Sequence, residues 1–121
     1  MSKRILVVED TEDNRQIIRD LMVSAGYELI EAANGAEGVA MASQHVPDLI
    51  LMDIQLPVLD GYEATRRIKA DPKTKHIPVI AVTSYALSGD EAKTRAAGCD
   101  AYVAKPFSPR QLLSTVRKFL P

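Results

Sequence analysis

Three carboxylates, a hydroxyl and an ammonium group each follow a short apolar run of the sequence. Glu9 and Asp10 come directly after one run, Asp53 after a second, and Thr83 and Lys105 after two later ones. If these runs are parallel strands of one sheet, their carboxyl ends bring the five side chains to one edge. The pattern predicts a site at that edge that handles a cation and an anionic group.

The three carboxylates create an electrostatic problem that a divalent cation solves. Like charges held close together resist ionisation, and one lysine offsets only one of them. Mg²⁺ binds oxygen ligands from one or two carboxylates and keeps several waters. We therefore expect Mg²⁺, or Mn²⁺, with Asp10 and Asp53 as direct ligands and Glu9 acting through a water molecule.

A carboxylate in such a site can attack a phosphoryl group and form an aspartyl phosphate. Asp53, at the end of a buried strand, is the predicted nucleophile. Catalysis of phosphoryl transfer consists mainly of positioning and charge stabilisation. We expect the cation to bind one phosphoryl oxygen, Lys105 a second, and the Thr83 hydroxyl with nearby backbone N–H groups the third.

Five apolar runs of strand length alternate with five stretches of helical period. The predicted strands are residues 5–8, 27–32, 49–52, 79–82 and 101–104. The predicted helices are residues 14–25, 35–44, 61–70, 89–97 and 109–119. This alternation predicts an α/β fold: a doubly wound (βα)5, flavodoxin-like sheet of five parallel strands in the order 2-1-3-4-5. The second strand carries Glu28 and Glu31, which is typical of an edge.

The composition is that of an ordinary globular domain. The chain has 121 residues with a net charge of −1, so one domain over residues 1–121 and no nucleic-acid partner are expected. No apolar run approaches the roughly 18 residues of a membrane span, so no membrane association is expected. Cys99 is the only cysteine, which fits a reducing cytoplasm.

Four stretches together resemble the receiver domain of bacterial response regulators, the CheY-like superfamily, and the resemblance covers the whole chain. They are residues 5–10 (ILVVED), residues 48–57 (DLILMDIQLP), Asp60-Gly61 and Lys105-Pro106. Residues 61–65 and 89–99 look like single-domain regulators of the cell-division-control (DivK-like) type, and also like receivers attached to hybrid kinases.

The resemblance implies a role for each matching residue. Asp53 would be the phosphoacceptor, and Gln55 would offer its backbone carbonyl to Mg²⁺. Thr83 and Tyr102 would form the switch pair that responds to phosphorylation. The Lys105–Pro106 peptide bond would be cis and would direct the lysine into the site.

The implied function is two-component phosphorelay signalling without catalysis of any reaction except the protein's own phosphorylation and dephosphorylation. The phosphoryl group would come from a histidine kinase, a histidine phosphotransferase or acetyl phosphate. A downstream protein would bind the face made by the fourth helix, fifth strand and fifth helix of a monomer or weak dimer. With no output domain, the protein would act as a single-domain regulator; a receiver excised from a longer regulator or hybrid kinase is the alternative. Tyr85, near the path of attacking water, is expected to slow loss of the phosphoryl group.

Other interpretations of the same residues are weaker. An aspartate-nucleophile phosphatase of the haloacid-dehalogenase pattern needs a second aspartate where Gln55 stands. A flavodoxin-like flavin binder needs a phosphate-binding loop where the acidic residues 9–13 would repel phosphate. Tyr102 could also be a half-buried packing residue, and Thr83 an ordinary β-branched strand residue.

Overall fold

The computed structural model describes residues 2–83 and 90–120, in which five strands alternate with five helices. The strands are β1 (Arg4–Val8), β2 (Glu28–Ala32), β3 (Leu49–Asp53), β4 (Val79–Thr83) and β5 (Ala101–Ala104). The helices are α1 (Glu12–Ser24), α2 (Gly35–His45), α3 (Gly61–Ala70), α4 (Asp90–Ala97) and α5 (Pro109–Phe119). All strand pairs are parallel, and their order β2-β1-β3-β4-β5 confirms the prediction.

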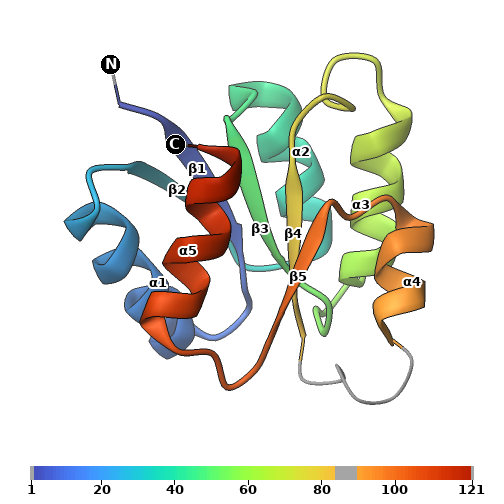
Figure 1. The fold of residues 1–121 in the computed structure, drawn as a ribbon. Coiled ribbons are helices and arrows are strands. Elements are labelled where there is room, and N and C mark those ends of the chain that lie inside the picture. The colour runs from blue at the N-terminus through green and yellow to red at the C-terminus, as the bar shows by residue number, and fades with distance from the viewer. Residues whose placement is uncertain (1, 84–89, 121) are drawn as a thin grey trace.

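Helices cover both faces of the sheet, with α1 and α5 on one face and α2, α3 and α4 on the other (Figure 1). Successive side chains of a strand point to opposite faces. Ile5 and Val7 of β1 therefore pack under α1 and α5, whereas Leu6 and Val8 pack in the core that α2 and α3 cover. This double burial explains why the central strands are apolar without alternation.

The chain ends and the predicted site lie at opposite ends of the sheet. Both termini are at the end where the strands begin, and the loops that follow β1, β2, β3 and β5 are at the other (Figure 1). Asn34 begins α2 by accepting a hydrogen bond from the Glu37 N–H, and Asp60 begins α3 in the same way from the Glu63 N–H. The side chains that follow β1, β3 and β5 therefore lie at one edge of the sheet, as does Thr83 at the end of β4.

The first helix differs from the prediction, because α1 begins at Glu12 rather than at residue 14. Glu12 and Asp13 occupy its first turn, where acidic side chains interact favourably with the N-terminal end of the helix dipole. The other boundaries agree within a residue or two, and the predicted start at residue 89 lies outside the described residues. None of the helices in the described ranges combines the length and apolar character needed to cross a membrane.

Candidate functional site

The three predicted carboxylates meet at the carboxyl edge of the sheet. Glu9, Asp10 and Asp53 each offer an oxygen atom, and these atoms all lie within 4.8 Å of one another. Glu9 is only 2% exposed and Asp53 only 4%, whereas Asp10 is exposed to solvent. Two buried carboxylates and one exposed carboxylate thus surround a single point.

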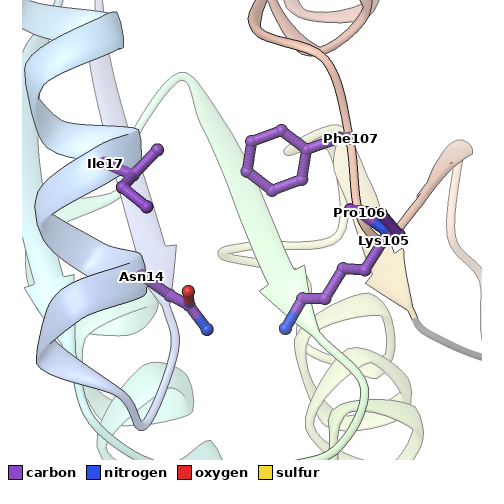
Figure 2. Close-up of a pocket in the computed structure, with 5 residues that line it drawn as sticks. All are labelled: Asn14, Ile17, Lys105, Pro106 and Phe107. Carbon is purple, nitrogen blue, oxygen red and sulfur yellow. The ribbon is translucent and has the colours of Figure 1, made fainter.

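Lys105 brings a positive charge to this cluster. Its Nζ lies 3.1 Å from Asp53 Oδ2, to which it donates a hydrogen bond, and 3.6 Å from Glu9 Oε1. The Lys105–Pro106 peptide bond is cis, as the resemblance implied. Figure 2 shows the extended lysine side chain reaching from the segment after β5 toward Asn14 of α1.

Asn14 is a site residue that the sequence analysis missed. Its Nδ2 donates a 2.7 Å hydrogen bond to Glu9 Oε1. The available signal was its position five residues after Glu9, in what proves to be the first turn of α1. From this position the Asn14 side chain reaches back to Glu9, at the end of the preceding strand β1.

The loop after β3 holds the Asp53 carboxylate from the other side. The backbone N–H of Gln55 donates a 3.1 Å hydrogen bond to Asp53 Oδ1. The N–H of Gly61 at the start of α3 donates to the Ile54 carbonyl at 3.0 Å. Residue 55 therefore lies beside the carboxylate, where the resemblance places a backbone carbonyl ligand.

The two predicted switch residues, Thr83 and Tyr102, lie at different positions along the strands. Thr83 is fully buried at the end of β4, directly after Val82, which pairs with Asp53 across the sheet. Tyr102 pairs with Ala81 and is partly buried against the core that α2 and α3 cover. Their coupling stays a prediction, and Tyr85 lies outside the described residues.

The electrostatics of the cluster fit a cation. The pKa of Glu9 is raised to about 7, first because burial disfavours the charged carboxylate and second because Asp53 lies beside it. Asn14 and Lys105 act in the opposite direction but only offset part of this effect. Glu9 Oε2 is buried without a hydrogen-bond partner among the residues that the structure describes. An oxygen-seeking divalent ion would satisfy that atom and relieve the repulsion.

Replacing Glu9 with glutamine should change how the stability of the metal-free protein depends on pH. The pKa of about 7 in the folded protein exceeds the ordinary value of 4.5, so the folded state holds the proton more tightly. That contribution to stability is full below pH 4.5 and is lost as the pH rises through 7. Between about pH 4.5 and about pH 8, the free energy of unfolding of Glu9→Gln relative to the parent should rise by about 1–3 kcal/mol. Urea unfolding in EDTA measures this, and a pH-independent difference would contradict it.

A cavity of about 550 Å³ opens beside Lys105, between α1 and the segment that leads into α5. Its lining combines Asn14 and Lys105 with the apolar side chains of Ile17, Pro106 and Phe107. Figure 2 shows Ile17 and Phe107 facing one another across it. The site therefore has an apolar rim on its α1 side.

Comparisons with known proteins agree with this geometry. Residues 5–117 match the response regulator receiver domain family. The chain is 48% identical over 120 residues to the polar-differentiation response regulator DivK of Brucella anthropi, and the match covers 99% of this chain and 98% of that protein. The DivK protein of Brucella ovis is 47% identical over the same shares.

Solved structures give the same result. The receiver domain of a sensor histidine kinase from Pseudomonas aeruginosa PAO1, with a magnesium ion coordinated in its active-site cleft, is 39% identical with a TM-score of 0.93; the match covers 99% of this chain and 98% of that one. The chemotaxis response regulator CheY4 of Vibrio cholerae is 28% identical with a TM-score of 0.93, over 98% of this chain and 99% of that one. The chain therefore belongs to the receiver domain family of response regulators, the signalling domains of two-component phosphorelays.

Proposed function

We propose that this receiver accepts a phosphoryl group on Asp53 from a phosphohistidine of a histidine kinase or a histidine phosphotransferase. The observation that carries the proposal is the buried Asp53 carboxylate, which lies between two further carboxylates and the Lys105 ammonium group. Glu9, Asp10, Asp53 and the Gln55 carbonyl are the proposed ligands of Mg²⁺, or of Mn²⁺. When bound, the ion would neutralise negative charge on the carboxylates and on the incoming phosphoryl group.

The chemistry is a simple displacement at phosphorus. An oxygen of Asp53 forms a bond to phosphorus while the bond from phosphorus to the histidine nitrogen breaks, and that nitrogen leaves with the electron pair. Lys105 Nζ, 3.1 Å from the attacking carboxylate, is placed to neutralise a phosphoryl oxygen. The Thr83 hydroxyl is proposed to donate a hydrogen bond to another. Hydrolysis of the aspartyl phosphate would return the domain to its resting state, and we propose no other catalytic activity.

Phosphorylation is proposed to change which protein the domain binds. Thr83 and Tyr102 lie on adjacent strands, β4 and β5, and would move together when a phosphoryl group attracts the threonine hydroxyl. The affected surface is the face made by α4, β5 and α5. Along α5, Arg110, Arg117 and Lys118 are exposed and no acidic residue occurs, which favours a partner with an acidic surface.

We propose that residues 1–121 act in the cytoplasm as a single-domain regulator, as a monomer or weak dimer. The basis is the likeness to DivK over 98% of that protein, together with a buried free thiol at Cys99, which a reducing compartment preserves. The alternative is a receiver that belongs to a longer regulator or hybrid kinase, supported by the likeness to the receiver domain of the Pseudomonas kinase.

Intact-mass measurement tests the proposed function directly. The protein is incubated with acetyl phosphate and Mg²⁺, and separately with a phosphorylated histidine phosphotransferase. We expect the mass to increase by one phosphoryl group, and we expect EDTA to prevent the increase. If neither donor produces the adduct in the presence of Mg²⁺, the proposal is wrong.

The apolar rim predicts how a protein donor docks, because a phosphohistidine can reach Asp53 only if its protein contacts the rim of the site. Ile17 is 54% exposed and faces Phe107 across the cavity beside Lys105. Ile17→Asp should slow phosphotransfer from a protein donor roughly tenfold, because a charge replaces an apolar contact. Transfer from acetyl phosphate should not change.

A matched substitution separates docking from a general surface effect. Val23 is 56% exposed on the same helix but does not line this cavity, so Val23→Asp should leave both donors unaffected. Stopped-flow or quench-flow transfer rates give the comparison. An equal loss with Ile17→Asp and Val23→Asp, or a loss with acetyl phosphate too, would exclude the proposed docking position.

A further inference from the structure

We propose that Arg15 is a positioning residue for the metal site, acting through the backbone of Glu9. The inference rests on the proposed function, because it concerns the Mg²⁺ site formed by Glu9, Asp10 and Asp53. Arg15 touches none of the carboxylate oxygens of that cluster in the described contacts. It instead donates a hydrogen bond to the peptide group between Glu9 and Asp10, the residues that carry two of the three carboxylates.

The guanidinium of Arg15 joins three elements of the fold. Its Nη1 donates a 2.6 Å hydrogen bond to the carbonyl oxygen of Glu9, just beyond the end of β1. Its Nη2 donates to Glu12 Oε2 at 2.5 Å, in the first turn of α1. Its Nε lies 3.4 Å from Glu31 Oε1 on the edge strand β2. The side chain is only 15% exposed, so little water competes for these contacts.

The direction of the Glu9 carbonyl affects the geometry of the metal site. It belongs to the peptide group that links Glu9 to Asp10, and a peptide group is planar. Fixing the direction of this carbonyl therefore limits the directions of both side chains that flank it. The N–H of Glu9 is held on its other side by the Ala32 carbonyl at 3.0 Å. Arg15 completes the restraint that the β1–β2 ladder begins.

Arg19 provides a natural control, because it shares the acidic partners of Arg15 but not the contact with Glu9. Its Nε donates to Glu31 Oε2 at 2.7 Å, and its Nη2 donates to Glu12 Oε1 at 3.0 Å. Among the described residues, none of its hydrogen bonds reaches Glu9. Replacing Arg19 thus disturbs the same glutamates and removes the same charge, yet leaves the Glu9 carbonyl with its donor.

The sign of the effect distinguishes positioning from electrostatics. Removing a positive charge near an acidic site makes the local potential more negative, which by itself tightens binding of a cation. Loss of a positioning contact has the opposite effect, because the carboxylates must be ordered again when the ion binds. Arg15→Ala is therefore expected to weaken Mg²⁺ binding although it removes a repulsive charge.

Isothermal titration calorimetry of the whole chain with Mg²⁺, at constant pH and ionic strength, is the test. We expect Arg15→Ala to raise the dissociation constant about five- to tenfold, within reach of the effects known for groups that orient metal ligands. Arg19→Ala should bind Mg²⁺ at least as tightly as the parent. Arg15→Lys keeps the charge but cannot contact Glu9, Glu12 and Glu31 together, so its dissociation constant should lie between those of the parent and Arg15→Ala.

Each outcome of the titration decides a separate point. The inference is overturned if folded Arg15→Ala binds Mg²⁺ as tightly as the parent, or if Arg19→Ala loses as much affinity. If circular dichroism shows that Arg15→Ala does not fold, Arg15→Lys decides: parent-like affinity overturns the inference and an intermediate value supports it. If the parent itself binds no Mg²⁺, the proposed metal site is wrong. That result differs from the one in which the parent and Arg15→Ala bind Mg²⁺ with the same affinity.

Discussion

Asp53→Asn should abolish formation of the phosphoryl adduct while the protein remains folded. The amide has nearly the same shape as the carboxylate but lacks the negative charge and the nucleophilic oxygen. It also cannot form an ion pair with Lys105 Nζ, which lies 3.1 Å from Asp53 Oδ2. We expect no adduct with either acetyl phosphate or a phosphohistidine donor, measured by intact mass in the presence of Mg²⁺.

Two controls make the result specific to Asp53. Asp20→Asn makes the same substitution at an exposed position of α1 and should be phosphorylated like the parent. Urea unfolding of Asp53→Asn should show no loss of stability, because the variant removes one of the charges that raise the pKa of Glu9. An adduct that persists on Asp53→Asn would place the phosphoryl group on another residue of the cluster.

Gly61→Ala should damage both the fold and the site, although glycine at this position bears no reactive group. A Cβ atom there would lie 2.2 Å from the Asp53 carbonyl oxygen and 2.6 Å from the Ile54 Cα. Both are backbone atoms, so neither can rotate away, and the start of α3 must move from the end of β3. We expect a loss of about 2–4 kcal/mol in the free energy of unfolding. Phosphorylation should slow roughly tenfold, because the crowding displaces Asp53. Displacing a reacting group by up to about 1 Å lowers the reaction rate by at least this factor.

Gly38→Ala is the matched control, since it makes the same change where the crowding is of another kind. A Cβ at Gly38 would meet the side-chain methyl groups of Val8 at 2.9 and 3.0 Å, away from the Asp53 backbone. Some stability should be lost as Val8 shifts, but the phosphorylation rate should stay near that of the parent. Chemical denaturation and adduct formation should be measured for both variants. If Gly61→Ala keeps parent-like stability and rate, the close contact of α3 with Asp53 is unimportant.

Much of the fold follows from local patterns in the sequence. The runs ending at Val8 and Asp53 are apolar without alternation, and this pattern correctly predicts parallel strands covered on both faces. The start of α1 was predicted two residues late, because Glu12 and Asp13 have the composition of a solvated loop as well as that of a first helical turn. Local composition alone does not distinguish these two states.

The sequence by itself determined which chemical groups stand at the strand ends, because in a parallel sheet of this order the strand-end residues share one edge. It therefore predicts that Glu9, Asp10, Asp53, Thr83 and Lys105 meet. The structure brings the three carboxylates and the lysine together and places Thr83 at the end of the neighbouring strand β4. Only the tertiary structure decided how strongly these groups interact. The raised pKa of Glu9 depends on burial by several elements at once.

The same holds for the residues that support the site. The hydrogen bonds of Asn14 and Arg15 to Glu9, and the close approach of Gly61 to Asp53, join segments whose relative positions are set by packing. Such contacts are sensitive to changes of a few tenths of an ångström in the separation of the elements. Residue types and spacing along the chain fix which element follows which, whereas these distances arise only when the helices pack on the sheet.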